Sequence, residues 1–168
     1  MKQKNVFLMC GVPGSGKTTW IKKQLAESNV GGVHISRDEV RFSMLKDDED
    51  YFARETEVFS AFCSKIQEAL EDAAGPANVF IDATHLSEKA RNKVLDRLDL
   101  RNVTNLYAVD FNIPLDICLA QNDMRSGRAF VPKSQVRRMF YQYQRPTENE
   151  KYKYTVLTVA PREETENE

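Results

Sequence analysis

Eight residues near the N-terminus, Gly11-Val12-Pro13-Gly14-Ser15-Gly16-Lys17-Thr18, place spaced glycines ahead of a lysine and a threonine. The segment before them, Asn5 to Cys10, is almost continuously apolar and predicts a buried strand. The segment after them predicts a helix with Trp20, Ile21 and Leu25 on one face. The chain therefore begins with a glycine-rich turn that joins a buried strand to an amphipathic helix.

The spacing Gly-x-x-x-x-Gly-Lys-Thr is that of a phosphate-binding loop, or P-loop. Its glycines let successive backbone amides point at phosphate oxygens, and the following helix offers its free amides to the same anion. Lys17 is expected to reach the β- and γ-phosphates, and the Thr18 hydroxyl to ligate magnesium. Average residue usage gives this string by chance in roughly one chain of this length in a hundred or fewer. The sequence therefore predicts binding of a purine nucleoside triphosphate with Mg²⁺ rather than a ligand-free turn.

The rest of the chain alternates short apolar strands with amphipathic helices. Further strands are expected at 33–35, 79–81, 106–111 and 154–159, with helices between them. The longest helix is expected over about 50–74, with Phe52, Phe59, Phe62, Ile66, Ala69 and Ala73 on its apolar face. The pattern predicts a P-loop NTPase-type α/β fold, a three-layer sandwich with a mostly parallel five-stranded sheet and a helical lid. Residues 1–160 are expected to form this single domain, and 161–168 an acidic disordered tail.

In parallel sheets the ligand binds beyond the carboxyl ends of the strands. Four expected strands end at Cys10, Ile35, Ile81 and Phe111. The P-loop, Asp38 and Asp82 should therefore meet at one edge of the sheet, although they are distant in sequence. P-loop proteins place an acid at such a strand end to hold the magnesium ion or its water, so Asp82 is expected beside Thr18.

Composition and charge restrict the class of protein. The chain has 168 residues and a net charge of −1, and no stretch is long and apolar enough to cross a membrane. The apolar segment at 6–10 is too short for a signal peptide, so a cytoplasmic location is expected. Cys10, Cys63 and Cys118 are expected to be buried reduced thiols. Acidic residues gather at 47–50 and in the tail. The segment 122–145 carries a predicted positive patch of Arg125, Arg128, Lys133, Arg137, Arg138 and Arg145.

A P-loop alone is shared by GTPases, ATP-driven motors and kinases. The Asn-Lys-x-Asp guanine reader is missing, because the nearest string, Asn92-Lys93-Val94-Leu95, lacks the acid, and the chain is short for a motor. A small P-loop kinase is therefore predicted. Asp38 and Arg41 share one face of a helix, where Asp38 could accept the proton of an acceptor hydroxyl and Arg41 could bind an acceptor anion. On spacing alone, a solvent-facing ion pair worth about 0.5 kcal/mol or less is the preferred interpretation.

A second basic element follows Asn122. Arg125 and Arg128 flank Ser126-Gly127, a flexible turn ahead of Val131-Pro132 and the next helix. This arrangement is typical of a lid that brings arginines over the phosphates on closure. A basic surface turn is an equally good interpretation from the sequence alone.

Several motifs, taken in order, give the chain a resemblance to a known family. They are the P-loop through Trp20, Ser36-Arg37-Asp38-Glu39-Val40-Arg41, Phe80-Ile81-Asp82-Ala83-Thr84-His85-Leu86, and the segment from Asn122 to Pro132 with Val136-Arg137-Arg138-Met139. The chain resembles the kinase domain of the phage polynucleotide kinase family over nearly its whole length. The P-loop occurs in many families, whereas the Arg-Asp-x-x-Arg string joined to Asp-x-Thr and the arginine-rich segment is more selective.

The resemblance implies transfer of the γ-phosphate of ATP to the 5′-hydroxyl of DNA or RNA, as in the repair of nucleic acid ends. Lys17, Asp38 and Arg125 would be the catalytic residues, with Asp38 as general base. The nucleotide would be bound by Gly11, Pro13, Gly14, Ser15, Gly16, Lys17, Thr18, Thr19, Arg125 and Arg128. The metal would be held by Thr18 and Asp82. The acceptor would be bound by Asp38, Arg41, Asp82 and Thr84. His85 is also expected to line the acceptor site, because it lies at the strand end beside Asp82.

The chain departs from the family pattern at two positions, because His85 stands where the family commonly has Asn and Gln121 replaces a basic residue. Two alternatives therefore stay open. One is a small-molecule kinase of similar fold that acts on a nucleoside, sugar or antibiotic, including the zeta-toxin type. The other is a non-catalytic ATP-binding module. His34, inside an expected strand, is interpreted as a packed core residue.

Overall fold

Five parallel strands form the sheet at the centre of the structure, a computed structural model that describes residues 3–161. The strands are β1 (Lys4–Cys10), β2 (Gly32–Ser36), β3 (Asn78–Asp82), β4 (Val103–Phe111) and β5 (Thr155–Val159). Their order across the sheet is β2-β3-β1-β4-β5, and each neighbouring pair is parallel. The predicted five-stranded sheet is confirmed, and it is parallel throughout rather than mostly parallel.

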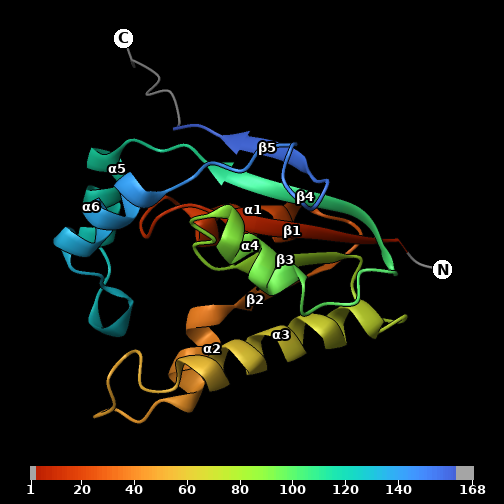
Figure 1. The fold of residues 1–168 in the computed structure, drawn as a ribbon, viewed down its shortest axis with the longest axis horizontal. Coiled ribbons are helices and arrows are strands. Elements are labelled where there is room, and N and C mark those ends of the chain that lie inside the picture. Colours follow the sequence, from red (N-terminus) through yellow and green to blue (C-terminus); the bar gives the residue numbers. More distant parts are fainter. Residues whose placement is uncertain (1–2, 162–168) are drawn as a thin grey trace.

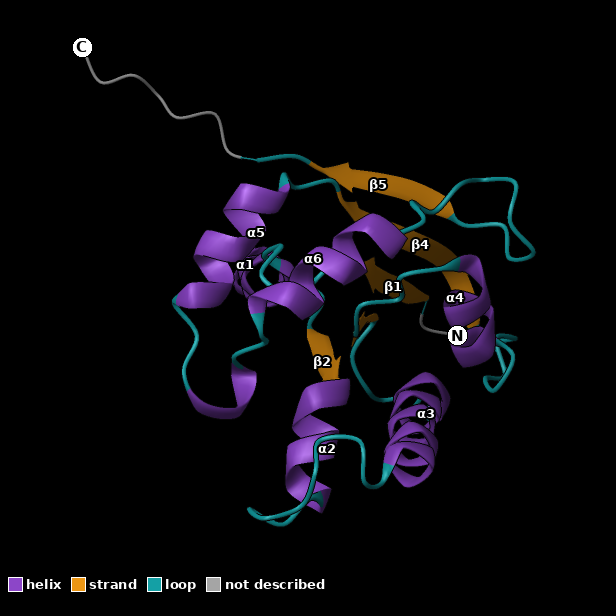
Figure 2. Cartoon of the chain, turned by 60° about the vertical axis from the view of Figure 1, so that its left-hand side comes forward, coloured by secondary structure: helices purple, strands orange, loops and turns teal. Residues whose placement is uncertain are grey.

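Within residues 3–161, six α-helices and one 3₁₀ turn connect the strands. They are α1 (Lys17–Glu27), α2 (Arg37–Met44), α3 (Glu55–Glu71), α4 (Glu88–Leu95), α5 (Leu115–Asp123), the 3₁₀ turn Gly127–Ala129, and α6 (Lys133–Gln142). Buried residues of α2, α3 and α4 pack on one face of the sheet, and those of α1, α5 and α6 pack on the other. The three-layer α/β sandwich is therefore confirmed (Figures 1 and 2). None of these helices is long and apolar enough to span a membrane.

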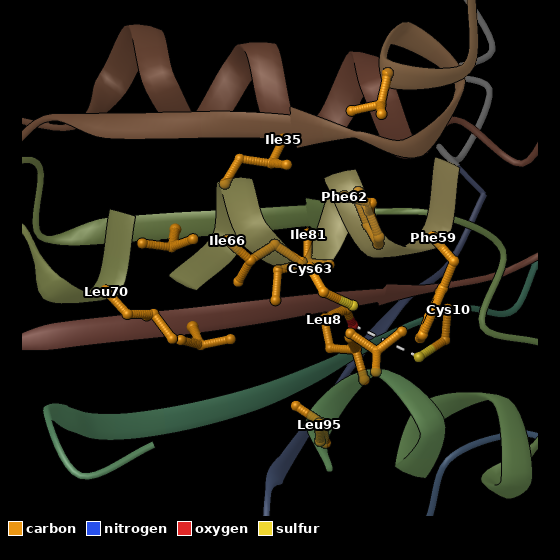
Figure 3. Packing of buried hydrophobic residues seen from close by; sticks show 14 of the residues in the cluster. Leu8, Cys10, Ile35, Phe59, Phe62, Cys63, Ile66, Leu70, Ile81 and Leu95 are labelled. Carbon is orange, nitrogen blue, oxygen red and sulfur yellow. Dashed lines mark hydrogen bonds between the residues drawn. The ribbon is translucent and has the colours of Figure 1, made fainter. Parts of the chain in front are cut away.

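The central strand shows how the sheet is held between the two layers. In β1, Val6, Leu8 and Cys10 belong to the core on the α3 side, whereas Met9 belongs to the core on the α1 side. This alternation is the period of two expected for a strand buried on both faces. Figure 3 shows residues of the first core, with Leu8 and Cys10 beneath the side chains of α3. Packing on both faces fixes the strand ends and the loops that follow them.

These loops gather at the carboxyl edge of the sheet. Figure 1 shows β4 and β5 pointing toward the side of the molecule where α5, α6 and the start of α2 lie. The P-loop follows β1 at this edge, α2 begins directly after β2, and the turn at 83–87 follows β3. The predicted meeting of three distant segments at one edge is therefore what the topology produces.

The helix predicted over about 50–74 is shorter at both ends. It begins at Glu55 and ends at Glu71, residues 51–54 form turns, and Phe52 is 57% exposed instead of lying on the apolar face. The reason is a tertiary contact, because the hydroxyl of Tyr51 lies against Asp38 and Arg41 at the start of α2. Residues 51–54 therefore belong to a loop that reaches this contact, in place of the predicted first turn of the helix.

The three cysteines are free and buried, as predicted. Burial raises the pKa of the Cys10 thiol to about 12 and that of the Cys118 thiol to about 11. Both thiols are therefore protonated at neutral pH and act as small apolar side chains in the core.

Candidate active site

The P-loop requires glycine at two positions, because of its backbone conformation and its close approach to α5. Gly14 and Gly16 have φ angles of +82° and +95°, which favour glycine. A Cβ on Gly14 would lie 2.2 Å from the carbonyl oxygen of Cys118 in α5. The Ser15 hydroxyl is buried without a hydrogen-bond partner among the described residues. A buried, unpaired donor beside a helix N-terminus fits a phosphate oxygen as its missing partner.

The Lys17 ammonium lies folded over this loop. Its Nζ donates to the carbonyl oxygens of Gly11 and Val12, each at 2.9 Å, and the residue is only 7% exposed. Burial lowers the pKa of Lys17 to about 8, the charge of Asp82 opposes this, the charge of Arg125 adds to it, and Asp38 weakly opposes it. These three charges come from segments distant in sequence, the end of β3, the first turn of α2 and the segment after α5.

Thr18 and Asp82 meet as predicted. The Thr18 hydroxyl donates to Asp82 Oδ2 at 3.0 Å, and His34 Nε2 donates to the same oxygen at 2.7 Å. Burial opposes ionisation of this carboxyl, but the hydrogen bond from His34 and the charge of Lys17 keep its pKa below the usual value. The expectation that His34 is only a packed core residue is therefore wrong. Its ring orients the acid at the end of β3.

The donor set around Thr18 fits magnesium in the way that nucleotide sites use it. Among residues 3–161, no group of three or more His, Cys, Asp or Glu side chains is arranged to hold a metal. Mg²⁺ keeps several waters and is usually held by one or two protein oxygens together with substrate phosphates. A hydroxyl and an ionised carboxylate in contact beside the P-loop provide those protein oxygens. The residues present therefore fit Mg²⁺ bound with a triphosphate.

Asp38 and Arg41 form part of a larger polar cluster at the start of α2. Ser36 caps the helix by accepting from the Glu39 amide, as the sequence predicted. Arg41 donates to Asp38 Oδ1 at 2.6 Å and to the Tyr51 hydroxyl at 2.6 Å, and Tyr51 donates to the same Asp38 oxygen at 2.7 Å. Within this cluster, the side chain of Asp38 is 52% exposed, so Asp38 is the residue expected to contact a substrate.

Arg41 itself is not a surface charge. It is 4% exposed and pairs with both carboxylate oxygens of Glu55 in α3, one of them at 2.8 Å. The interpretation as a solvent-facing ion pair, which spacing alone preferred, is therefore wrong for Arg41. Its Nε is buried without a partner among the described residues. Glu55 and Arg41 together fix the orientation in which Asp38 meets the solvent.

The turn after β3 supports the P-loop from behind. The Gly11 amide donates to the Thr84 carbonyl oxygen at 2.9 Å. His85 has a φ of +42°, is 4% exposed, and donates from Nδ1 to the Met9 carbonyl oxygen at 2.5 Å. Its Nε2 is buried without a partner among residues 3–161. The ring therefore packs inward against β1, and the geometry gives His85 a supporting position rather than the acceptor-lining position expected from its place at the strand end.

A buried ion pair anchors this turn to the C-terminal part of the chain. Arg91, 1% exposed, donates from Nε and Nη2 to the two carboxylate oxygens of Glu150, at 2.8 and 3.1 Å. The same guanidinium donates to the His85 carbonyl oxygen at 2.9 Å. Tyr154 donates to Glu150 at 2.5 Å. Because every partner is buried, the cluster holds the turn at 84–85, and through it the P-loop, in one position.

The lid is the short segment 123–130, and hydrogen bonds between Asn122 and Val131 hold its two ends together. Asn122, fully buried, donates to the Val131 carbonyl oxygen at 2.6 Å and accepts from the Val131 amide at 3.2 Å. Between them, Arg125 is half-buried, and its guanidinium lies 3.5 Å from the Ala129 carbonyl oxygen. The backbone of Arg128 lies in the 3₁₀ turn, but its side chain lies outside the described part of the structure. Arg125 is thus the lid arginine whose charge acts on Lys17.

The predicted positive patch is partly neutralised. Lys133 pairs with Asp123 at 3.3 Å, and Arg145 pairs with the buried Asp110 at 2.7 Å. Arg137 and Arg138 are exposed on α6. The basic character of this segment therefore rests on fewer free charges than the sequence count of six implies.

Sequence reasoning missed several residues of the site. His34 carried only a weak signal, a histidine among the apolar residues of a strand. Side chains two apart on a strand point to the same face, so His34 shares a face with Ser36, the last residue of β2. Tyr51 and Glu55 carried no comparable signal, since their contacts with α2 depend on the path of the loop at 45–54. Asn122 and Arg91 act through buried contacts with segments that are distant in sequence.

Comparisons with known proteins agree with this geometry. The fold and the site define a P-loop kinase. A family model described as an AAA domain matches residues 6–146, and the chain belongs to this family. A comparison with curated proteins finds no match.

Among solved structures, a chain of the Pnkp1/Rnl/Hen1 RNA repair complex is similar at 21% identity and a TM-score of 0.70. The match covers 84% of this chain and 44% of that one, so this chain spans less than half of that relative. A fungal RNA kinase is 16% identical, with a TM-score of 0.60 and coverage of 99% and 78%. A gluconokinase from Sinorhizobium meliloti 1021 is 14% identical, with a TM-score of 0.56 and coverage of 95% and 84%. These likenesses establish the fold.

Proposed function

We propose that the chain is an ATP-dependent kinase that transfers the γ-phosphate to the 5′-hydroxyl of DNA or RNA. The observation that carries the proposal is the half-exposed carboxylate of Asp38, in the first turn of α2, which follows β2 at the edge of the sheet where the P-loop lies. Arg41 and Tyr51 both bind its Oδ1, which leaves Oδ2 as the oxygen available to a proton. The charge of Asp38 also acts on the pKa of Lys17, which supports a position of the two side chains on the same side of the molecule.

The proposed reaction uses these groups in defined roles. Asp38 takes the proton of the 5′-hydroxyl as that oxygen bonds to the γ-phosphorus. The bond from the γ-phosphorus to the β,γ-bridging oxygen breaks, and ADP leaves with the electron pair. Lys17 and Arg125 stabilise the charge on the transferring group, and the P-loop amides of Gly14 and of residues 16–19 hold the phosphates. Mg²⁺, held by Thr18 and Asp82, would neutralise charge between the β- and γ-phosphates.

A polynucleotide acceptor is supported by the set of motifs that resembles the polynucleotide kinases, and two similar folds come from RNA-modifying proteins. One observation favours a second candidate, a kinase for a small, uncharged acceptor such as a sugar. Arg41 is already engaged by Asp38, Tyr51 and Glu55, so an acceptor phosphate would have to displace part of that pairing. Thr84 and Asp82 lie at the end of β3, where either acceptor would approach.

The test is transfer of labelled phosphate from ATP with Mg²⁺ to a panel of 5′-hydroxyl DNA and RNA oligonucleotides, nucleosides and sugars. Labelled oligonucleotide is the expected product. Asp38→Asn should lower kcat by about 10²–10⁴-fold while ATP affinity stays unchanged, because a general base is lost without a change in the P-loop. Label only in a sugar or nucleoside would establish the second candidate. ATP binding with no transfer to any acceptor would indicate a non-catalytic module.

A further inference from the structure

Three basic side chains from two helices surround one aromatic ring outside the site described above. Relative to the ring centroid of Phe59 in α3, the guanidinium carbon of Arg37 lies at 5.4 Å, Lys93 Nζ at 4.6 Å and the guanidinium carbon of Arg97 at 5.5 Å. Arg37 comes from the first turn of α2, Lys93 from α4, and Arg97 from the turn that follows α4. We call Arg37, Lys93 and Arg97 the α2–α4 basic cluster.

Two members of the cluster have no carboxylate partner. Lys93 and Arg97 are exposed, and within residues 3–161 neither forms an ion pair. Arg37 shares Glu55 with Arg41, at 3.3 Å, and its Nε is buried without a partner in the described part of the chain. The charges of all three also act together on Cys63, one turn beyond Phe59, where burial raises the pKa of the thiol and the three cations oppose it.

Like charges gathered around one ring repel each other, and a cation–π contact at an exposed site contributes only about 0.5–1 kcal/mol. Packing alone therefore gives little reason for three cations at this place. An anion bound from solution would supply the missing counter-charge. Several positive groups spread over neighbouring helices suit an extended anion better than a single phosphate.

The cluster begins beside the proposed acceptor site. Arg37 directly precedes Asp38, and its charge also contributes to lowering the pKa of His85 in the turn after β3. Figure 3 shows Phe59 at the same end of the core as Cys10, the last residue of β1, so the ring lies near the P-loop edge of the sheet. The loop at 45–54, which contacts Asp38 through Tyr51, carries the acidic run 47–50.

A polyanionic strand whose 5′ end lies at Asp38 would be repelled by the acidic residues of the loop at 45–54 and attracted by the α2–α4 basic cluster. We infer that Arg37, Lys93 and Arg97 bind the phosphodiester backbone of the acceptor strand on the 3′ side of its terminal nucleotide. This inference rests on the proposed function, because it requires a polynucleotide acceptor. Phosphate contacts of this kind position a strand without reading its sequence, so the acceptor preference concerns length rather than base identity.

The test variant is Lys93→Gln with Arg97→Gln, which removes two charges and retains two methylene groups of each side chain. The matched control is Lys22→Gln with Lys23→Gln, which removes the same charge from exposed positions on α1, on the opposite face of the sheet. Thermal melting establishes that both variants are folded. Phosphorylation kinetics are then measured with a 5′-hydroxyl 10-mer and with a nucleoside 3′-monophosphate, which carries only the terminal nucleotide and its phosphate.

The cluster variant should raise the KM for the 10-mer about tenfold, with kcat and the KM for the 3′-monophosphate unchanged. In anisotropy titrations of a 3′-labelled single strand, the slope of log Kd against log salt should fall by about 1.4, since each lost contact to a single strand contributes about 0.7. The control variant should match the wild type. If the wild type is active but the cluster variant keeps the wild-type KM and salt slope, the role of the cluster is refuted and the proposed function is not. A wild type inactive on every polynucleotide would refute the proposed function and the cluster together.

Discussion

Replacing His85 with asparagine should change the way in which the stability of the fold depends on pH. The ring is 4% exposed, donates from Nδ1 to the Met9 carbonyl oxygen, and holds Nε2 buried without a partner. Burial lowers the pKa of His85 to about 4, the hydrogen bond to Met9 opposes this shift, and the charge of Arg37 adds to it. Asparagine tolerates the φ of +42° at this position and does not titrate.

The magnitude follows from the two pKa values. The unfolded ring titrates near 6.5 and the folded ring near 4, so between these values the unfolded chain binds more protons. Stability is therefore lost as the pH falls from about 7 to 4. At 1.36 kcal/mol per pKa unit, His85 should account for about 2 kcal/mol of that loss at pH 5. At pH 7 the variant should be less stable by about 1 kcal/mol, because the bond to Met9 is lost.

The assay is urea unfolding of both proteins at pH 7, 6 and 5, followed by the fluorescence of Trp20, the one tryptophan of the chain. Carboxylates titrate in both proteins, so the difference between them isolates His85. The variant should be the less stable protein at pH 7 and the more stable one at pH 5. A difference that stays constant within about 0.5 kcal/mol across this range would show that the ring is not held neutral by burial.

Further predictions concern the clamp that the buried pair of Arg91 and Glu150 forms on the turn at 84–85, the general base and the metal. Glu150→Ala should lower the free energy of unfolding by about 3–5 kcal/mol, because it strands a buried arginine charge, whereas Lys151→Ala, in an exposed pair, should change it by about 1 kcal/mol or less. Equal effects of the two in urea unfolding would contradict the clamp. Tyr51→Phe should lower kcat about tenfold with an unchanged KM for ATP, since Asp38 loses one of its two hydrogen bonds; steady-state kinetics that show weaker ATP binding instead would argue against this role. Thr18→Ala should raise the Mg²⁺ concentration needed for half-maximal activity by about tenfold or more, and a Mg²⁺ titration that matches the wild type would exclude Thr18 as a ligand.

Local sequence rules were sufficient to predict the phosphate-binding part of the site. The P-loop, the strand before it and the helix after it involve contacts between residues close in the chain, and glycine at positive φ leaves few other conformations. The contact between Thr18 and Asp82 could also be predicted, because parallel strand ends meet at one edge. The same rule did not reveal that His34 binds Asp82, since a strand pattern shows which face a residue occupies and not what it contacts.

The acceptor side could be predicted only in part. Asp38 and Arg41 were identified by spacing and resemblance, but spacing favoured a weak surface pair. The structure buries Arg41 because Glu55 approaches from α3 and Tyr51 returns from a loop that the sequence had assigned to a helix. The pattern of residues on one helix face does not predict which side chains of a neighbouring element will contact it.

The amino-acid sequence by itself determined the phosphate loop, the alternation of strands and helices, and the edge of the sheet at which the functional residues meet. Each of these depends on short-range periodicity, on backbone freedom at glycine, or on the uniform direction of parallel strands. Only the tertiary structure decided which side chains support Asp38 and Asp82, that His85 faces inward, and that Arg37, Lys93 and Arg97 converge on Phe59. Most of those contacts join residues 13 to 76 positions apart in the chain. Their partners are set by packing between layers, which no local pattern encodes.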